Sequence, residues 1–576
     1  MTFSVKLKKA NLITMGLLMS CVVWAIPGFG ATGACTHSTD PCVLTYHNDS
    51  ARDGVNPNET ILNVANINNT SSRSFGRLFT TTNVDGQVYA QPLFMHNVTI
   101  NSVANKDAVF VATENDSVYV FDADSTVGSN PTPLWHTSLL VTNEAAVPDS
   151  ALPGKCKNIT PQVGVTGTPV IDASKGVLYV VSKLQQTVNG STTYHQWLNA
   201  VNLNDGHARF GGRVEITATN FNPLVQNQRA GLALGPNGHI YISWASHCDS
   251  EPTGGFYHGW VMEYMVNSSN MLQRVNVFND TAGSSGRDGG IWQAGGAPAI
   301  DGGGNLFLAT GNGTFDVPPA PYPARDLGPD YGVSVLKLSS SLAVLDAFTP
   351  QDEHFINLKS NDLDLGSGGV VLINTTSPPE ITSAGKDQHI YVMNQTNLGG
   401  FAGVNDNCLT MVCNTNIIQD MYPALLQSGC TGTELGNRAT PAFFNNVLYS
   451  AGSEDSLRAF TLNTSTGAFN TTPAMTSQHV FCYPGASPSV SASGTSNGIV
   501  WVLDTTAFGH PGPAVLLAYD ATASGTGVAA TYASSTNTSD QAPNAVKFAP
   551  PTVANGKVFV SGSGALAVYG LCPCAP

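Results

Sequence analysis

Eight side chains stand out in this sequence because their types suit acid–base chemistry or ligand binding, and most of them follow short apolar segments at corresponding places. Carboxylates, imidazoles and amines can exchange protons with a ligand or hold it by charged hydrogen bonds, and an indole can form an apolar wall. The same side chains can instead complete hydrogen bonds inside the fold, so no catalytic residue is assigned. The candidate ligand-binding residues are Glu114, Arg229, His247, Trp292, Gln293, Asn312, Lys386 and Glu454.

A second group of polar residues, Asn361, Asp362 and Asp364, offers oxygen ligands of the kind that Ca²⁺ prefers. The alternative is that these side chains cap turns, as Asp and Asn commonly do. Asp362 and Asp364 are therefore candidate metal ligands with a structural alternative. The sequence contains no Gly-x-Ser-x-Gly elbow, phosphate-binding loop or His-Glu-x-x-His motif, so it gives no support to the enzyme classes built on them.

An internal repeat sets the positions of these residues. Each unit starts with a small apolar strand, usually containing a Pro, then passes a turn and enters an alternating strand rich in Val, Tyr and Phe. The copies begin at Gln91, Gly167, Arg229, Gly296, Gly368, Ala439, Ser487 and Ala549. Units that start roughly 50 to 80 residues apart are typical of propeller blades with variable loops.

The period-two alternation indicates half-buried strands, and turns such as Asn237-Gly238 suit tight hairpins. The sequence therefore predicts an all-β protein, an eight-bladed β-propeller with four-stranded blades. Seven blades and an array of β-sandwiches are the alternatives. Because strand ends of a propeller converge on its axis, we expect Glu114, His247, Trp292 and Lys386 to share one end of the central channel.

The two ends of the chain are predicted to meet in the last blade. The last repeat unit has no outer strand of its own, whereas Phe75–Thr80 precedes the first unit without a hairpin partner. We expect this segment to complete the last blade as its outer strand. Such closure removes an open sheet edge that would otherwise invite aggregation.

The N-terminus resembles a secretion signal, with Lys6, Lys8 and Lys9 before an apolar stretch that ends at Pro27. The predicted organisation is a signal peptide over 1–34, an N-terminal extension over 35–74 and the propeller over 75–576. A retained N-terminal anchor and a lipoprotein acylated at Cys21 are the alternatives. The mature protein is expected to be secreted, or to lie in the periplasm or at the cell surface.

Ten cysteines remain after the predicted signal, and an even number in an exported chain favours disulfides. Cys35 with Cys42 and Cys408 with Cys413 are close enough in sequence to staple local loops. For the non-local bridges we suggest Cys156 with Cys248 and Cys430 with Cys482. Cys572 and Cys574 can pair internally or fasten the C-terminus, and no spacing favours a zinc site.

Charge and hydropathy limit the partners. The formal net charge is −15, only 11% of residues are charged, and no basic run stands out, so nucleic acid is not expected as a partner. No apolar stretch after the signal is long enough for a membrane helix. The expected partners are a small polar ligand or an extracellular or envelope protein, and the protein is expected to be a monomer.

The repeats resemble those of pyrroloquinoline-quinone-type (PQQ-like) propellers, most clearly at Asp116–Asp122 and Thr166–Asp172. The resemblance covers roughly residues 75 to 570. The chain also looks like large secreted bacterial proteins that carry this repeat without an assigned activity. Tyr46–Asp49, Gly289–Gln293, Thr310–Asp316 and Asn361–Gly368 look like signatures of that group.

The resemblance implies a fold more than a function, because this scaffold serves both quinoprotein dehydrogenases and non-catalytic assembly factors. The chain lacks the adjacent cysteine pair of quinoprotein alcohol dehydrogenases and has no Cys-x-x-Cys-His motif. We therefore expect an exported propeller that presents a ligand- or partner-binding face without quinoprotein catalysis. The alternatives are a quinone- or Ca-dependent oxidoreductase, with PQQ or Ca²⁺ as cofactor, and an envelope assembly scaffold; whether the protein is an enzyme stays open.

Overall fold

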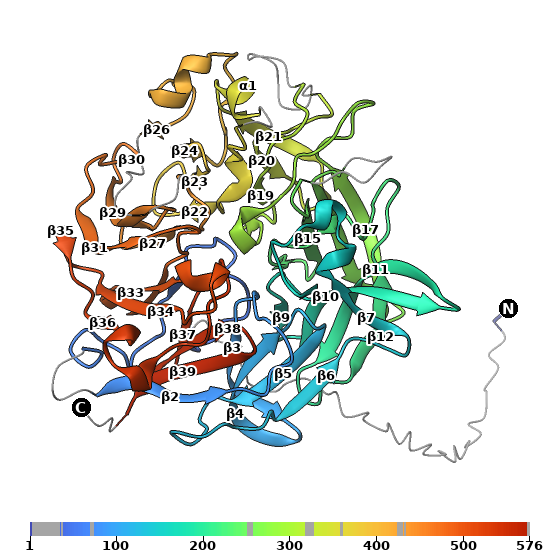
Figure 1. The fold of residues 1–576 in the computed structure, drawn as a ribbon. Coiled ribbons are helices and arrows are strands. Elements are labelled where there is room, and N and C mark those ends of the chain that lie inside the picture. Colours follow the sequence, from blue (N-terminus) through green and yellow to red (C-terminus); the bar gives the residue numbers. More distant parts are fainter. Residues whose placement is uncertain are drawn as a thin grey trace.

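The computed structural model describes residues 1–2, 35, 39–68, 74–249, 257–316, 328–357, 361–422, 430 and 434–572. Eight separate sheets stand around a central axis like the blades of a fan (Figure 1). The chain is thus an eight-bladed β-propeller, as the repeat predicts. Most blades have the predicted four strands at their centre, and several carry one or two additional short strands.

The first four blades follow one another along the chain. Blade 1 consists of β3 (Leu93–Ile100), β4 (Val103–Ala112), β5 (Ser117–Asp122) and β6 (Trp135–Ser138). Blade 2 consists of β7 (Glu144–Pro148), β8 (Gln162–Val163), β9 (Val170–Asp172), β10 (Val177–Val188), β11 (Ser191–Asn202) and β12 (Ala208–Glu215). Blade 3 consists of β13 (Gln226–Asn227), β14 (Ala233–Leu234), β15 (Ile240–Ser246), β16 (Trp260–Val266) and β17 (Leu272–Asn279). Blade 4 consists of β18 (Ala299–Ile300), β19 (Leu306–Ala309), β20 (Val335–Leu338), β21 (Val344–Thr349) and β25 (Gly400–Phe401).

The other four blades complete the ring. Blade 5 consists of β22 (Val371–Ile373), β23 (Glu380–Ala384), β24 (Ile390–Asn394) and β26 (Gln419–Met421). Blade 6 consists of β27 (Ala442–Phe444), β28 (Val447–Ser450), β29 (Asp455–Asn463), β30 (Ala468–Phe469), β31 (Met475–Phe481) and β35 (Gly525–Val528). Blade 7 consists of β1 (Val55–Asn56), β32 (Ser489–Ser493), β33 (Ser496–Asp504), β34 (Val515–Asp520) and β36 (Tyr532–Ala533). Blade 8 consists of β2 (Phe75–Thr81), β37 (Thr552–Ala554), β38 (Lys557–Gly562) and β39 (Ala565–Leu571).

Helical segments are short and lie in the connections. The α-helix α1 (Glu353–Ile356) follows blade 4. The 3₁₀ turns are η1 (Asp149–Ala151), η2 (Pro153–Lys155), η3 (Gln293–Gly295), η5 (Leu365–Ser367), η6 (Asp406–Thr410), η7 (Thr506–Gly509), η8 (Ser534–Thr536) and η9 (Thr538–Asp540). Among the described residues, none of these helices is long and apolar enough to span a membrane.

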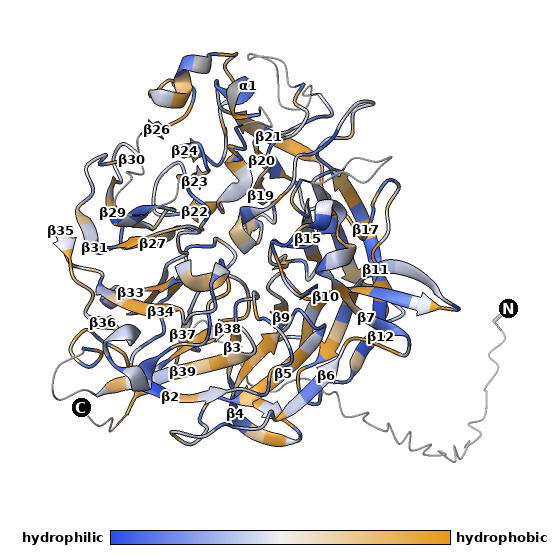
Figure 2. Cartoon of the chain, in the orientation of Figure 1, coloured by the Kyte–Doolittle hydropathy of each residue, from blue (hydrophilic) through white to orange (hydrophobic). Residues whose placement is uncertain are grey.

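The hydrophobic core lies between neighbouring blades, because each blade buries apolar side chains against the next one. Between blades 8 and 1, for example, Phe559 stacks on Phe94 with ring centroids 5.4 Å apart, and Leu566 and Val109 are fully buried beside them. Apolar residues accordingly concentrate along the strands, and polar residues on the connecting loops (Figure 2). Such packing fixes each blade relative to its neighbours, so residues on the inner strands keep a constant position around the axis.

The outer strand of blade 8 comes from the beginning of the chain. Strand β2 pairs antiparallel with β39, from Phe75 opposite Leu571 to Thr81 opposite Leu566. This is the pairing expected from the sequence, and it joins residues near both ends of the chain in one sheet. The edge of β39 is thereby covered.

The described part of the N-terminal extension does not form a separate unit but runs around the inner strands at one end of the channel. In six of the eight blades the inner strand offers the backbone N–H two residues after the repeat Pro position, and a carbonyl of the extension accepts it. These hydrogen bonds are Phe94 to Val43, Ile171 to Leu44, Ile300 to Ser50, Leu372 to Ala51, Phe443 to Asp53 and Val490 to Gly54, at 2.8–2.9 Å. The extension therefore contacts blades 1, 2, 4, 5, 6 and 7 in chain order.

Arg52 locks this segment in place. Its guanidinium is 1% exposed and donates to the carbonyls of Pro298, Tyr46 and Asp49 at 2.7–3.1 Å. Gly54 permits the tight path, since its φ is +75° and a Cβ there would meet the His47 ring at 2.6 Å. The extension is thus an integral part of the propeller's interior.

Four disulfides are present: Cys35–Cys42, Cys156–Cys248, Cys408–Cys413 and Cys430–Cys482. All four pairings expected from the sequence are confirmed. The suggestion for Cys572 and Cys574 stays a prediction, because Cys574 lies outside the described residues. Residues 3–34 of the predicted signal peptide also lie outside them.

Candidate functional site

One position of the repeat gathers side chains around the axis at the end of the channel away from the N-terminal extension. This position is the residue three places before the repeat Pro or its equivalent. It precedes by five residues the N–H that binds the extension. At ~3.3 Å per extended residue, the two positions are separated along the strand by about 16 Å. Around the ring this position holds Tyr89, Thr166, Arg229, Gly295, Ser367, Arg438, Gly485 and Phe548. Five of these eight residues, Tyr89, Arg229, Ser367, Arg438 and Phe548, line one cavity of about 290 Å³.

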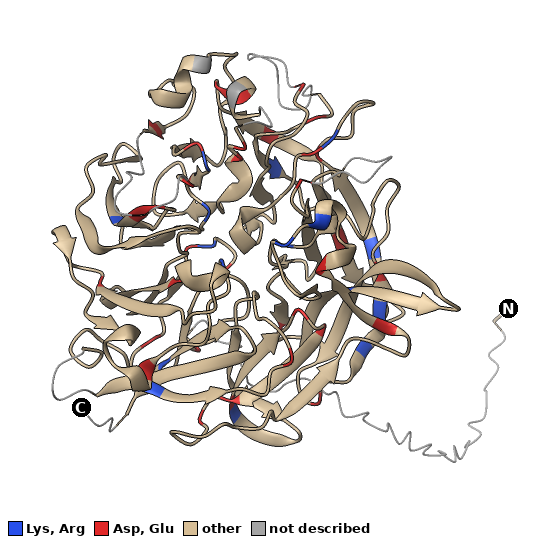
Figure 3. Cartoon of the chain, viewed as in Figure 1, with Lys and Arg blue, Asp and Glu red and all other residues tan. Residues whose placement is uncertain are grey.

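Charged and aromatic groups dominate the wall of this cavity. The cations are Arg229, Lys386, Arg438 and Lys547, the carboxylates are Asp249, Asp362, Asp364 and Glu434, and the rings are Tyr89, Trp292, Tyr483 and Phe548. Segments with basic and acidic residues lie close together at the inner ends of the blades (Figure 3). The disulfide Cys156–Cys248 contributes Cys248 to the same wall.

On one side of the cavity the charges are paired. The Lys386 ammonium lies 2.7 Å from Asp364 and 2.9 Å from Asp362. Burial alone would lower the pKa of Lys386, but Asp364 and Asp362 outweigh it, so its pKa lies above the usual value. Burial likewise opposes ionisation of Asp364, yet Lys386 holds the pKa of this carboxyl below its usual value. The three groups form a closed ionic cluster.

This cluster bears on the candidate metal ligands. The Lys386 ammonium sits between Asp362 and Asp364, where a cation bound by both would have to lie. Among the described residues, no group of three or more His, Cys, Asp or Glu side chains is arranged to hold a metal ion. The ionic pairing therefore explains the two aspartates without a metal, and Ca²⁺ does not fit this donor set.

On the other side the cations outnumber the carboxylates. The Arg229 guanidinium lies 5.2 Å from the Phe548 ring centroid and 6.0 Å from that of Tyr89, and it donates to the Ala294 carbonyl at 3.2 Å. The Lys547 ammonium lies 5.8 Å from the same Phe548 ring. Such contacts stabilise a cation without neutralising it.

Arg438 belongs to the same side. Its guanidinium lies 5.2 Å from the Tyr483 ring and pairs at 2.8 Å with Glu434, whose side chain is 58% exposed. Burial, followed by the positive charges of Arg229 and Arg438, lowers the pKa of Lys547 to about 8. Arg229, Arg438 and Lys547 together form what we call the cation trio.

The structure places three of the eight sequence-predicted ligand residues, Arg229, Trp292 and Lys386, on this cavity, whereas the other five do not line it. The expectation that Glu114 and His247 share a ligand site with Trp292 and Lys386 stays a prediction, since neither residue lines this cavity. Both are buried, and Glu114 binds the hydroxyl of Thr166, which occupies the same repeat position as Arg229. Both residues follow the end of a strand, β4 at Ala112 and β15 at Ser246, so the alternation of strand side chains does not fix where they point.

Glu114 and His247 form hydrogen bonds between blades. Glu114 accepts hydrogen bonds from the Gly164 N–H at 2.8 Å and the Thr166 hydroxyl at 3.0 Å, and burial raises its pKa to about 8. His247 lies with Nε2 2.7 Å from the Lys183 ammonium. Burial and then this neighbouring charge hold the pKa of His247 well below its usual value, so the neutral ring accepts a hydrogen bond from Lys183 at Nε2.

The remaining three predicted residues also have hydrogen-bond partners within the fold, although for Asn312 it is the backbone N–H and not the side chain that is bonded. The Gln293 side chain donates to the Gly296 carbonyl at 2.9 Å and accepts from the Ala309 N–H at 3.1 Å. The Asn312 N–H donates to Asp364 at 2.7 Å, and Glu454 accepts from the Glu434 N–H at 2.9 Å. Asn312 and Glu454 line neighbouring depressions rather than the cavity itself.

The sequence interpretation missed Tyr89, Arg438, Tyr483, Lys547 and Phe548. A signal for three of them was present, because Tyr89, Arg438 and Phe548 occupy the same repeat position as Arg229, three places before the Pro. Lys547 could have been found from Phe548, because it is the residue directly before it. Tyr483 had no such signal, since it lies in a connection beside the disulfide partner Cys482.

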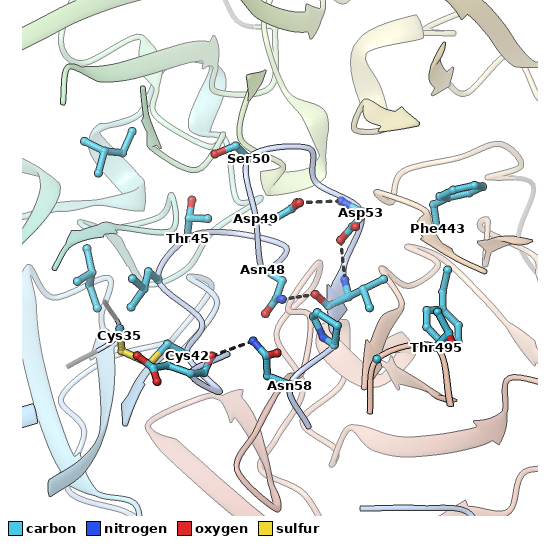
Figure 4. A pocket seen from close by; sticks show the side chains of 18 of the residues that line it. Cys35, Cys42, Thr45, Asn48, Asp49, Ser50, Asp53, Asn58, Phe443 and Thr495 are labelled. Atoms are coloured by element: carbon cyan, nitrogen blue, oxygen red, sulfur yellow. Dashed lines mark hydrogen bonds between the residues drawn. A yellow bond between two sulfur atoms is a disulfide. The ribbon is translucent and has the colours of Figure 1, made fainter. Parts of the chain in front are cut away.

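The opposite end of the channel also has a cavity, of about 630 Å³, between the extension and the inner strands (Figure 4). Its polar side chains are used by the extension itself. Asp49 accepts from the Asp53 N–H at 3.3 Å, Asp53 accepts from the Val55 N–H at 2.9 Å, and Asn48 donates to the Val55 carbonyl. We therefore regard this end as a structural closure and the cation trio as the candidate site.

The chain is similar in fold to known quinoprotein propellers. It aligns with quinohemoprotein alcohol dehydrogenase from Comamonas testosteroni at a TM-score of 0.57 and 13% identity, over 92% of this chain and 80% of that one. It aligns with quinohemoprotein alcohol dehydrogenase ADHIIG from Pseudomonas putida HK5 at a TM-score of 0.55 and 11% identity, over 93% of this chain and 81% of that one.

A third structure, BamB from Moraxella catarrhalis, aligns at a TM-score of 0.42 and 11% identity, over 86% of this chain and 98% of that one, which is too low to carry an argument. No protein-family model and no curated protein sequence matches the chain. At these identities the likeness to the two dehydrogenases shows the propeller fold alone. Function has to be argued from the cavity.

Proposed function

We propose that this chain is an exported protein whose propeller binds a small organic anion, one with a carboxylate and a flat apolar part, in the cavity of the cation trio. The observation that carries the proposal is the charge balance of that wall. Among the described residues, Glu434 is the only carboxylate that forms an ion pair with Arg229, Arg438 or Lys547. Glu434 is largely exposed, so the three cations keep a net positive charge at the cavity, although Arg438 also donates to the carbonyls of Glu434 and Leu435.

The chemistry of the wall defines the ligand. Arginine presents a planar fork of donors that matches a carboxylate, and such charge-assisted hydrogen bonds are stronger than neutral ones. The Tyr89, Tyr483 and Phe548 rings provide apolar surface beside these donors. A volume of about 290 Å³ is at the small end for ligand pockets and suits a molecule of one or two rings.

Export is part of the proposal. Four disulfides between described residues are typical of proteins that mature outside the reducing cytosol. The low content of charged residues and the apolar N-terminal stretch agree with this. The monomeric state expected from the sequence stays a prediction.

A quinone cofactor held by calcium is not supported by the residues present. Lys386 already binds both candidate aspartates, and the disulfide in the cavity wall joins Cys156 to Cys248 rather than two adjacent cysteines. We derive no oxidoreductase step for this reason. For the envelope assembly scaffold, no feature of the described residues supplies a specific argument.

The proposal is tested by calorimetric titration of the mature protein with benzoate, cyclohexanol serving as a ligand without charge. We expect benzoate to bind and cyclohexanol not to bind. Arg229→Gln is expected to weaken benzoate binding about tenfold or more, because a hydrogen bond to a charged group contributes about 1.5–3 kcal/mol.

Arg274→Gln is the matched control, since Arg274 is an exposed arginine on the outer strand β17. It should leave the affinity for benzoate unchanged. Absence of benzoate binding to the wild-type protein, or equal affinity in Arg229→Gln, would overturn the proposed function.

A further inference from the structure

Lys547 differs from the other two lysines buried near the channel in what its amine contacts. Burial lowers the pKa of Lys183 as well, but its amine donates to two carbonyls, lies 2.7 Å from His247 and does not line the cavity, and Lys386 has two carboxylates. The Lys547 amine has one long hydrogen bond, 3.4 Å to the Asn158 side chain, within the part of the chain that the structure describes. Its charge is thus poorly compensated by neighbours.

The surroundings of Lys547 are apolar and positive. The amine lies 5.2 Å from the Phe508 ring centroid and 5.8 Å from that of Phe548, and the residue is 6% exposed while it lines the cavity. The charged groups that act on it are Arg229 from blade 3 and Arg438 from blade 6. A lysine that is desolvated beside other cations is the arrangement in which an amine becomes a nucleophile at neutral pH.

The protonation state agrees with this geometry. The pKa of Lys547 is about 8, lowered by burial and then by Arg229 and Arg438. About one tenth of the amine is then neutral at pH 7, compared with less than about one in a thousand for an ordinary lysine. The neutral amine carries the lone pair needed for attack on a carbonyl carbon.

We propose that Lys547 forms a reversible imine with a ligand that carries a carbonyl group next to its carboxylate, that is, a 2-oxo acid with an apolar side chain. The inference rests on the proposed function, since Arg229 and Arg438 hold the carboxylate and thereby present the neighbouring carbonyl to the amine. The cavity then captures this ligand class covalently as well as by charge.

The step is balanced without an oxidant or reductant. The Nζ lone pair attacks the carbonyl carbon, and a proton moves from nitrogen to the former carbonyl oxygen to give a carbinolamine. The carbon–oxygen bond then breaks, water leaves and a carbon–nitrogen double bond forms. Addition of water reverses the sequence, so the protein is recovered unchanged.

The test is reductive trapping of the full mature chain with phenylpyruvate and sodium cyanoborohydride, followed by intact mass and peptide mapping. We expect one adduct per chain, located on Lys547, and protection by excess benzoate. Lys547→Arg should lose the adduct, because a guanidinium does not form an imine under these conditions. Lys106→Arg, a change at a surface lysine paired with Asp122, should trap as the wild type does.

The outcomes separate the two proposals. If benzoate binds the wild type but no adduct appears on Lys547, the imine is excluded and the anion site stands. If benzoate does not bind, the proposed function fails, and with it the basis of this inference. An adduct spread over surface lysines and equal in Lys547→Arg also overturns the imine.

Discussion

The two ends of the channel differ in how far their buried polar groups are hydrogen-bonded within the fold. At the end filled by residues 43–59, polar groups meet partners: Arg52 has its donors directed at carbonyls of the extension and of Pro298. At the other end, Arg229 makes one hydrogen bond to the Ala294 carbonyl among the described residues and otherwise lies over aromatic rings. Both arginines are nearly buried, so the difference lies in how far their charge is satisfied.

This difference indicates a division of labour. A satisfied buried arginine stabilises the fold, because its removal would leave several carbonyls without donors. An arginine whose donors face a cavity contributes little to folding but is available to a ligand. Substitution of each arginine therefore separates its contribution to stability from its contribution to binding.

The largest expected effect is on stability at the filled end. Arg52→Ala should lower the free energy of unfolding by about 3–5 kcal/mol, because several buried carbonyls lose their donor. Arg229→Ala should change it by about 1 kcal/mol or less. Urea unfolding of both variants measures the difference, and equal losses would contradict the division between the two ends.

A middle-sized effect is expected for His247, a residue that the sequence suggested for ligand binding. His247→Ala should lower the free energy of unfolding by about 2 kcal/mol, because it leaves the buried Lys183 ammonium without one acceptor. Benzoate affinity should stay as in the wild type. His207→Ala, at a side chain that is 83% exposed, is the control; an unchanged melting temperature in His247→Ala would return this residue to the list of ligand candidates.

The smallest expected effect is a pH dependence of benzoate affinity at the cavity of the cation trio. The pKa of Lys547 is lowered to about 8, so its positive charge is lost as the pH rises from 7 to 9. Benzoate stays ionised over this range, and its affinity should fall about three- to tenfold, the loss of roughly 1 kcal/mol from one nearby charge.

The yield of trapped phenylpyruvate should change in the opposite direction and rise with pH, because attack needs the neutral amine. In Lys547→Arg the affinity for benzoate should no longer depend on pH, since a guanidinium stays charged throughout. A wild-type affinity that is constant from pH 7 to 9 would show that Lys547 adds no charge to the site.

Much of the architecture was contained in the sequence because it is local and repeated. Period-two strands and turns such as Asn237-Gly238 predicted the blades, and the unpaired segment at Phe75 predicted the strand that pairs with β39. Cysteine spacing and the assumption of export were enough to suggest Cys156–Cys248, although 92 residues separate the two.

Which side chains face the axis depends on how the blades pack in three dimensions. Glu114 and Arg229 were both ligand candidates in the sequence, yet Glu114 binds the Gly164 N–H and the Thr166 hydroxyl, whereas Arg229 lines the cavity. Both residues lie in connections outside the strands, where the period-two pattern does not set the direction of a side chain. The extension follows its path around the inner strands because the ring is closed. Closure also brings Arg229, Arg438 and Lys547 together from blades that are distant in sequence. No local sequence pattern connects these blades.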